Sequence, residues 1–373
     1  MAKRIMIAAS GQHIGKTTCT LGIVVSLMNK GYDVGYCKPV GQQHLTINGK
    51  LADKDTVLFG NFLNFQVDPQ LHSPVIIGSG VTTKFLDNPE QFQFKEHIAF
   101  AKKELEAKHE IVVYEGTGHP GVGSIIQLSN AQVAKALDAA VILVIEGGIG
   151  RTIDKLNMSL SLFREQGIEI KGIIINKVHT DKFERIKKYL TKAVQHYNVP
   201  ILGLVPYDQT LSHPIMSTIA QSVFGKVMYH VDQLDNRVQD ILAGSLIEID
   251  DDVEFQNLLL VVNHSRFTEA IQKVKILAHQ MNLEKCPLSG VVVTGDGRQN
   301  QWYDPADFAD EYLQQHRVPI LTTTLDTYDT VVKISKIEVK INTHTPWKVY
   351  RAIELIQDHV DLSSILEEAP QTS

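Results

Sequence analysis

This sequence lacks several features that would place it in a specialised class. It has three cysteines, Cys19, Cys37 and Cys286, without CxxC spacing, so we expect reduced thiols in a cytoplasmic protein and no metal site built from them. No apolar run approaches the ~20 residues that span a bilayer, and a net charge of −6 is too mild for a general nucleic-acid or membrane-surface binder. The apolar N-terminal residues run into "SGQH" without a cleavage-site pattern, which favours a buried strand over a signal peptide.

The first part of the chain has the pattern of a parallel sheet. The full length of 373 residues, 43% of them apolar, suits two well-formed domains. Short β-branched runs alternate with helical stretches up to about residue 210, which is typical of βαβ units. The expected strands are residues 4–9, 33–37, 111–114, 140–145, 170–176 and 200–205. The expected helices are residues 16–30, 90–108, 130–137, 152–165 and 181–197.

A break marked by two prolines, "VPYDQTLSHPIM", interrupts this alternation. The pattern then restarts on a smaller scale, which predicts a second, smaller α/β domain. Its expected strands are 258–262, 290–294 and 319–323, and the expected helices are 266–281, 305–316, 327–338 and 346–359. We therefore divide the chain into residues 1–213, residues 214–345, and a C-terminal helix and tail at 346–373.

The stretch "SGQHIGKTT" is similar to a phosphate-binding loop with a displaced first glycine. The strict pattern is Gly, four residues, then Gly-Lys-Ser/Thr, and counting back from Gly15-Lys16-Thr17 puts Ser10 in first place, with Gly11 one place late. The stretch follows a strand pattern and opens a helical one, the context in which backbone N–H groups and a lysine bind phosphate. Thr17 would then offer its hydroxyl to Mg²⁺. The alternative is a plain strand–turn–helix with an exposed lysine.

Three charged residues elsewhere in the first part of the chain are candidates for the same site. Glu115 ends a strand in "IVVYEGTG", at the sheet edge where Lys16 is expected, and Asp55 begins a helix in "LADKDTVLF". Magnesium takes one or two carboxylates plus phosphate oxygens, so both are expected metal ligands. Lys38, in "CKPV", is expected to face a negative substrate or the terminal phosphate. The alternatives are a water-facing carboxylate for Glu115, a helix cap for Asp55 and a solvated side chain for Lys38.

The segment "IIINKVH" ends a buried strand much as the NKxD element does in guanine-specific P-loop proteins. Its fourth position is His179 rather than Asp, so the carboxylate that accepts from the guanine N1 and N2 hydrogens is missing. Asn176 alone can bond the amino group and ring nitrogen of adenine, which favours ATP over GTP. The alternative is an asparagine that closes a turn at the strand end.

Together, "GQHIGKTT", "CKPVG", Asp55, "YEGTG" and "IIINKV" resemble the dethiobiotin synthetase family of P-loop proteins, which also provides the synthetase domain of cobyrinic acid a,c-diamide synthase. Their order and spacing match that family over residues 3–210. A closer resemblance is to the N-terminal portion of bacterial phosphate acetyltransferases, in which a domain named for its DRTGG residues follows. Residues 215–335 resemble that second domain through "LLLVVNHSR" and "GVVVTGDG".

Two departures from that pattern limit what the resemblance implies. The Asp-Arg of the second domain is here Ser265-Arg266, and its Thr-Gly-Gly is "TGD", so a ligand of that motif does not carry over. The acetyltransferase catalytic domain is absent from the sequence, so we expect no phosphate acetyltransferase activity. The fold we predict is α/β, a P-loop NTPase-type parallel sheet with flanking helices plus a smaller DRTGG-like α/β domain.

The resemblance implies Mg-ATP as the cofactor and assigns the site residue by residue. Lys16, Lys38 and Glu115 are the expected catalytic residues, and Lys38 lies on the substrate side. The expected metal ligands are Thr17, Asp55 and Glu115. The expected nucleotide contacts are Gly11, Gln12, His13, Ile14, Gly15, Lys16, Thr17, Thr18, Asn176, Lys177 and Pro206.

Two functions are compatible with this reading. The first is a regulatory or sensory ATP-binding module with weak ATPase activity, in which the second domain senses a small-molecule effector or mediates assembly into a homo-oligomer. The second is an ATP-dependent ligase that phosphorylates a carboxylate or carbamate before an amine reacts with it. Beyond Lys38, the sequence identifies no residues of an organic-acid pocket, which favours the first function.

Overall fold

The computed structural model describes residues 2–244, 255–296, 303–337 and 339–366. The last residue of the helix expected at 327–338 and the tail from residue 367 lie outside the described residues. The chain forms two compact units. Unit 1 comprises Met1–Asp208 and Ile341–Ser373, and unit 2 comprises Gln209–Lys340. The sequence boundaries at 213 and 345 lie close to these junctions, but the order of the chain did not predict that its last segment joins unit 1.

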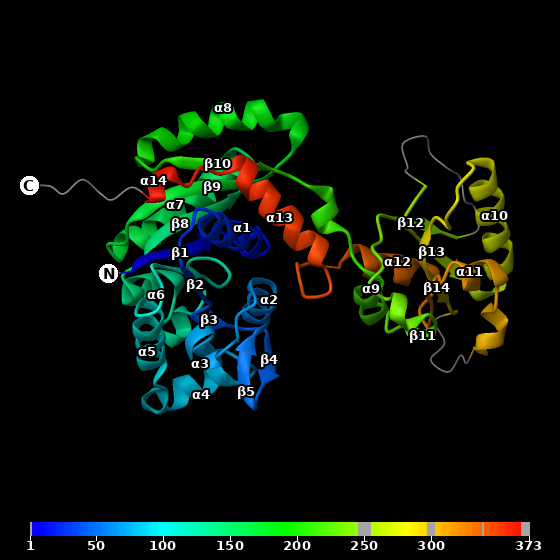
Figure 1. The fold of residues 1–373 in the computed structure, drawn as a ribbon, viewed down its shortest axis with the longest axis horizontal. Helices are drawn as coiled ribbons and strands as arrows, with labels where there is room; N and C mark the ends of the chain where they lie inside the picture. Colours follow the sequence, from blue (N-terminus) through cyan, green and yellow to red (C-terminus); the bar gives the residue numbers. More distant parts are fainter. Residues whose placement is uncertain (1, 245–254, 297–302, 338, 367–373) are drawn as a thin grey trace, which may run out of the picture. The chain divides into compact units, whose positions relative to one another are not determined.

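Unit 1 is built on a six-stranded sheet in the order β10-β9-β8-β1-β7-β2, in which every pairing is parallel (Figure 1). The central strands are almost fully buried because helices cover both faces, as expected for parallel sheets. The strands are β1 (Lys3–Ala9), β2 (Val34–Cys37), β7 (Ile111–Glu115), β8 (Ala140–Glu146), β9 (Ile170–Val178) and β10 (Ile201–Pro206). All six expected strands are confirmed within two residues.

Two helical layers flank this sheet. Helices α5 to α8 share one apolar core with one face, and α1 packs on β1 and β7. The helices are α1 (Lys16–Asn29), α5 (Phe94–Glu106), α6 (Asn130–Leu137), α7 (Gly150–Glu165) and α8 (Phe183–Val194). The helix expected from residue 90 begins at Phe94 instead, because Pro89–Gln91 forms a separate 3-10 turn.

The connection between β2 and α5 holds several short elements, of which the sequence predicted only a helix that begins at Asp55. They pair locally in two small two-stranded sheets, β3 with β6 and β4 with β5. The elements are β3 (Val40–Gly41), β4 (His44–Ile47), β5 (Lys50–Asp53), α2 (Lys54–Leu63), α3 (Pro69–His72), β6 (Val75–Ile76) and α4 (Val81–Asp87). Strands of two to four residues are too short for hydrophobic alternation to reveal them.

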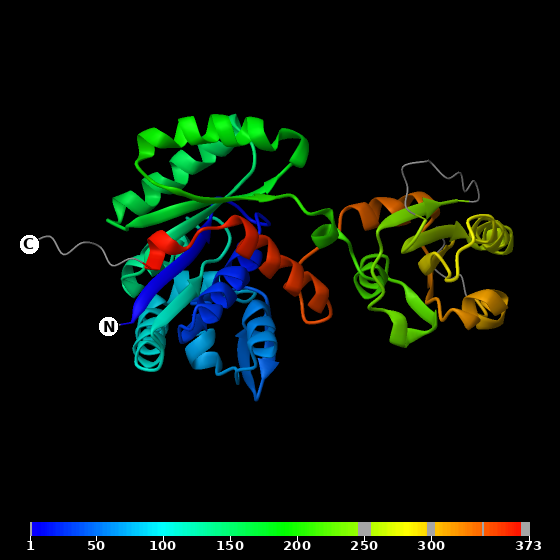
Figure 2. The same ribbon diagram turned by 45° about the horizontal axis from the view of Figure 1, so that its top comes forward.

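Helix α13 (Pro346–His359) completes unit 1, although unit 2 separates it from β10 along the chain. It lies along α1 and contacts β10 (Figures 1 and 2). Gly22 of α1 permits this approach, because a Cβ there would collide with the Cβ of Ile356. The backbone N–H of Asp361 then donates to the carbonyl of Leu202 on β10 at 2.8 Å. The short helix α14 (Ser363–Leu366) follows.

Unit 2 has a five-stranded sheet in the order β11-β15-β14-β13-β12, parallel except for the edge strand β11. One face packs on α10 and α11, and the other on α9 and α12. The strands are β11 (Lys226–Tyr229), β12 (Asp240–Ala243), β13 (Leu258–Asn263), β14 (Leu288–Thr294) and β15 (Ile320–Thr323). The helices are α9 (Met216–Ser222), α10 (Phe267–Gln280), α11 (Glu311–Gln315) and α12 (Thr327–Ser335).

The predicted fold class, a parallel sheet with flanking helices and a second α/β region, is thus confirmed. Across the described part of the chain, no helix combines the length and apolar character needed to cross a bilayer.

Candidate functional site

The loop of residues 10–15 joins β1 to α1 at the carboxyl edge of the parallel sheet. Only glycine suits position 15, since its φ is 97° and a Cβ there would collide with Nδ2 of Asn176. Helix α1 begins at Lys16, and no side chain caps its N-terminus. The N-terminus of a helix attracts anions through its first N–H groups and the helix dipole, so this end of α1 suits an anion.

The other predicted residues of this loop differ in burial. Gln12 and His13 are exposed at the turn, and His13 adopts a φ of 56°. Ile14 is buried and anchors the loop, whereas Gly11 and Thr18 are half-buried. In this loop a histidine, rather than a second glycine, therefore adopts the left-handed backbone conformation.

Three lysine ammonium groups lie beside this loop. Lys16 is half-buried rather than exposed, and its Nζ donates at 2.8 Å to a backbone carbonyl in the loop after β7. Nζ of Lys177 donates to the carbonyl of His13 at 2.6 Å. Lys155, on α7, places its Nζ 3.9 Å from where a Cβ of Gly11 would be. Positive charge gathered in this way attracts anions.

Glu115, at the end of β7, is buried with only 1% of its surface exposed, so the water-facing alternative is wrong. Each carboxylate oxygen accepts from one hydroxyl: Oε1 from Thr17 at 2.9 Å and Oε2 from Tyr36 at 3.0 Å. Burial, assisted by nearby Asp55, raises the pKa of Glu115 to about 7 against the attraction of Lys38. Burial and the carboxylates also raise the pKa of Tyr36, which therefore remains a donor.

Lys38, directly after β2, is 7% exposed, so the solvated alternative is wrong. Its Nζ lies 3.1 Å from Oδ1 of Asp53 and also pairs with the carboxylate of Asp55. Burial acts to lower the pKa of Lys38, but Asp55, Glu115 and Asp53 outweigh it and hold the pKa above its ordinary value. The site thus keeps a buried cation among carboxylates.

The cap of α2 is Asp53 rather than Asp55. Oδ1 of Asp53 accepts from the backbone N–H of Asp55 at 2.9 Å, and Oδ2 accepts from that of Gln42 at 3.1 Å. The capping alternative for Asp55 is therefore wrong, and its carboxylate pairs with Lys38 instead. The sequence analysis missed Asp53, although an aspartate two residues before a helical N–H is an N-cap signal.

Asn176, near the end of β9, binds the loop directly. Its Nδ2 donates to the carbonyl of Ile14 at 2.8 Å, and its Oδ1 accepts from the backbone N–H of Lys177 at 2.9 Å. The first bond braces the loop from β9, two strands away from β1, and the second holds the amide group in place. The expected contact with adenine stays a prediction. Pro206, at the end of β10, pairs in register with Val178, so it lies at the same sheet edge.

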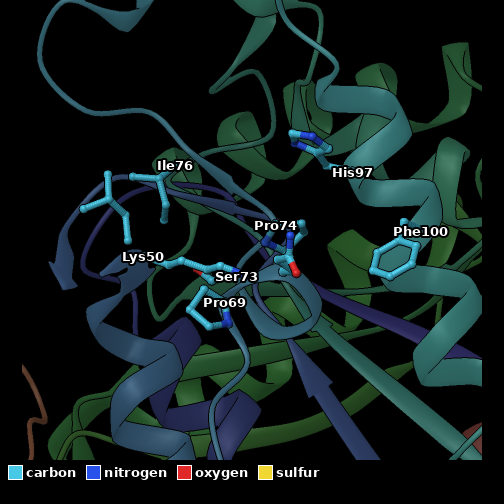
Figure 3. Close-up of a pocket in the computed structure, with 9 residues that line it drawn as sticks. Lys50, Pro69, Ser73, Pro74, Ile76, His97 and Phe100 are labelled. Atoms are coloured by element: carbon cyan, nitrogen blue, oxygen red, sulfur yellow. The ribbon is translucent and has the colours of Figure 1, made fainter. Parts of the chain in front are cut away.

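A cavity of about 450 Å³ lies next to this cluster, between β5, α3, β6 and the first turns of α5 (Figure 3). Ser73 connects the two, since its Oγ accepts from the backbone N–H of Asp53 at 2.8 Å. The lining mixes apolar and polar side chains: Lys50, Leu51, Pro69, Gln70, Ser73, Pro74, Ile76, His97 and Phe100. A pocket of this kind suits a small molecule with an apolar body and a polar end.

The structure brings four predicted residues, Thr17, Lys38, Asp55 and Glu115, into one connected set. Within the described ranges, no group of three or more His, Cys, Asp or Glu side chains forms a metal cage of its own. Magnesium does not require one, because it is usually held by one or two carboxylates together with substrate phosphates. Besides Asp53, two residues of this region were not predicted, Tyr36 and Lys155, because they lie on regular elements without any motif to mark them.

The comparisons with known proteins concern this region most directly. The family model of the AAA domain matches residues 3–215, more than half of the chain. The ATP-dependent dethiobiotin synthetase of Clostridium acetobutylicum is 29% identical over 54% of this chain and 85% of its own length. The probable cobyric acid synthase of Methanocaldococcus jannaschii is 28% identical over 57% of this chain and 47% of its own length.

Similarity to phosphate acetyltransferases extends further along the chain. The enzyme of Nitrosomonas europaea is 24% identical over 95% of this chain, and the chain spans about half (50%) of that protein's length. Among solved structures, the MinD cell division protein of Aquifex aeolicus is 15% identical over 56% of this chain and 84% of its own, with a TM-score of 0.38. The resemblance to dethiobiotin synthetases and phosphate acetyltransferases is confirmed, whereas the DRTGG assignment stays a prediction. This chain belongs to the AAA domain family, whose model matches residues 3–215.

Proposed function

We propose that this chain binds Mg-ATP at residues 11–18 and acts as a regulatory or sensory ATPase module. The observation that carries the proposal is the connected set of Thr17, Lys38, Asp55 and Glu115 beside the uncapped N-terminus of α1. Removing a cation and carboxylates from water lowers the stability of the fold, and groups of buried charges are more frequent at functional sites. We propose adenine as the base, with Asn176, Lys177 and Pro206 on its side of the site.

The residues present fit a magnesium ion, because Thr17, Asp55 and Glu115 all offer oxygen atoms, the ligands that this cation prefers. Bound there, Mg²⁺ would neutralise the charge of the phosphates. Lys16 and the first N–H groups of α1 would hold the outer phosphates, and Lys38 would orient the terminal one. Asp53 would position Lys38 through its ion pair while fixing the start of α2.

The regulatory part of the proposal rests on the second unit. We propose that unit 2 is the DRTGG-like domain, that it senses a small-molecule effector, and that the chain assembles as a homo-oligomer. Because the described strand ends of its sheet carry no buried charged side chain, unit 2 suits a sensing role better than a catalytic one.

The test of nucleotide binding is Lys16→Ala in the full chain, followed by calorimetric titration with Mg-ATP. We expect the affinity to fall at least tenfold, because one charge-assisted hydrogen bond is worth about 1.5–3 kcal/mol. Lys171→Ala is the matched control: this lysine sits at the start of β9, where it pairs with Glu169. Equal affinities in wild type and Lys16→Ala would refute the proposal.

A second candidate, an ATP-dependent carboxylate–amine ligase, is favoured by the cavity that Ser73 connects to Asp53 and Lys38. Such an enzyme transfers the terminal phosphoryl group to a carboxylate or carbamate oxygen, and an amine then displaces the phosphate. We would measure ADP formation with a panel of small amines, bicarbonate and carboxylic acids. Stimulation that is lost in Lys50→Ala supports the ligase, and a rate unaffected by every addition supports the module.

A further inference from the structure

We infer that Tyr36 is a positioning residue for the metal of this site: its hydroxyl fixes the carboxylate of Glu115, and its ring fixes the helix that carries Asp55. The inference rests on the proposed function, because Glu115 and Asp55 are the magnesium ligands proposed there. Neither the sequence motifs nor the family resemblance assigns Tyr36 a role.

The hydroxyl of Tyr36 completes the hydrogen bonding of Glu115. It donates to Oε2 at 3.0 Å, while Thr17 donates to Oε1 at 2.9 Å. The carboxylate is therefore held at both oxygens, by β2 and by α1, and cannot rotate without breaking a bond. Each oxygen has two lone pairs, so both retain one for a cation. Tyr36 is only 2% exposed, and bulk water therefore does not compete for this bond.

The ring of Tyr36 stacks on Phe59 of α2, with centroids 3.8 Å apart and planes 9° apart. Phe59 is fully buried and follows Asp55 by four residues, which places both on one face of the helix. The stack therefore fixes α2 against β2. One side chain thus touches Glu115 itself and the helix that presents Asp55, which sets the separation of the two carboxylates.

Tyr114 provides a matched control within the same sheet. It immediately precedes Glu115 in β7, and it is as deeply buried as Tyr36. Successive strand residues point to opposite faces, so Tyr114 faces away from Glu115. Within the described part of the chain, its hydroxyl has no hydrogen-bond partner. Replacing Tyr114 by phenylalanine removes the same atom as at position 36 without removing a bond.

The experiment compares Tyr36→Phe, Tyr114→Phe and wild type as full chains. ATP affinity is measured calorimetrically in EDTA and then across a Mg²⁺ titration. We expect Tyr36→Phe to match the wild type without metal, and its half-maximal Mg²⁺ concentration to rise about tenfold, as for the loss of one hydrogen bond to a charged group. Tyr114→Phe should superimpose on the wild type throughout.

The possible results separate this inference from the proposed function. A Mg²⁺ titration of Tyr36→Phe that superimposes on the wild type overturns the inference and leaves the function standing. A wild type whose ATP affinity ignores Mg²⁺ overturns both. An equal loss in both phenylalanine variants also overturns the inference, because it would reflect general loosening of the sheet.

One further variant covers the case in which Tyr36→Phe does not fold, and a double variant tests whether Tyr36 acts through Glu115. Phe59→Leu keeps every hydroxyl but removes the stack, and we expect a smaller rise in the half-maximal Mg²⁺ concentration. No rise would overturn the role of the ring. We expect Glu115→Gln to weaken the Mg²⁺ response by itself, so adding Tyr36→Phe should weaken it no further. An additive loss would show that Tyr36 does not act through Glu115.

Discussion

Two parallel sheets in this molecule carry different chemistry at their carboxyl edges. In unit 1, Lys38, Asp53 and Glu115 are all buried there and connected to one another. In unit 2, the described strand ends carry Asn263, which bonds to nearby backbone groups and to the carboxylate of Asp296, and Thr294, which bonds to a hydroxyl group. Among the described residues of unit 2, the only ionisable side chain that is buried is His213.

The difference shows which sheet is arranged to handle a charged ligand. Burying an ion costs several kcal/mol unless partners compensate for lost water, so a fold does not retain three ions at one edge without a use for them. The described strand ends of unit 2 carry no buried charged side chain. Similar architecture is therefore compatible with the nucleotide site proposed for unit 1 and with the different role proposed for unit 2.

The largest expected effect is a difference in Mg-ATP binding between two shortened chains that both lack unit 2. We expect a chain ended after Asp208 to lose Mg-ATP binding, because it also loses α13, which packs on α1 and β10 and buries Val349, Ile353, Leu355 and Ile356. At about 1.5–3 kcal/mol for each such side chain, the loss is comparable to the whole stability of a domain. Excision of residues 209–340, replaced by a flexible linker of about 15 residues, should preserve binding.

Calorimetric titration of both shortened chains checks this prediction, with circular dichroism as the control for folding. Wild-type affinity in the excised form would confirm that unit 1 holds the complete site. An excised form that folds but does not bind ATP would break the comparison, since unit 2 would then contribute to the site.

A smaller effect concerns stability and pH. Because burial raises the pKa of Glu115 from 4.5 to about 7, the folded chain binds this proton more tightly than the unfolded chain does. Burial of this carboxyl group therefore does not lower the free energy of unfolding below pH 4.5, where it is protonated in both states. The destabilisation grows as the pH rises from 4.5 to about 7. Without metal or nucleotide, Glu115→Gln should stabilise the fold at pH 8 by up to about 3 kcal/mol and have little effect at pH 4.

Thr294→Val is the corresponding change in unit 2. It removes a hydrogen bond between the hydroxyls of Thr294 and Thr327, which lie 2.8 Å apart. We expect a loss of about 1 kcal/mol that does not vary between pH 4 and 8. Urea unfolding of both variants at the two pH values checks the contrast. If the effect of Glu115→Gln on the free energy of unfolding did not change with pH, the buried carboxylate of unit 1 would not be destabilising.

The succession of strands and helices along the chain was predictable wherever a hydrophobic pattern repeated. The six strands of unit 1 and the bounds of α6 follow from β-branched runs and helical spacing, and Lys16 and Glu115 follow from their places at strand ends. Lys38 was predicted, but its burial was not, because the partner that neutralises it, Asp53, is a cap at the end of a short unpredicted strand.

The rest depends on contacts that no local pattern encodes. Tyr36 and Phe59 look like ordinary core residues until the stack and the bond to Glu115 are seen. The place of α13 could not be read from its amphipathic sequence, since that face would suit either unit. One signal was present: Gly22 lies in the middle of α1, where glycine weakens a helix unless something must come close.

The return of α13 onto α1 has a consequence for synthesis of the chain. A ribosome adds about 5–20 residues per second, and all of unit 2 is made before residues 346–359 appear. Throughout that interval, the face of α1 around Gly22 has no cover, so the nascent first unit waits in an incomplete state. Insertion of unit 2 thus delays completion of unit 1 during synthesis, because α13 is translated only after all of unit 2.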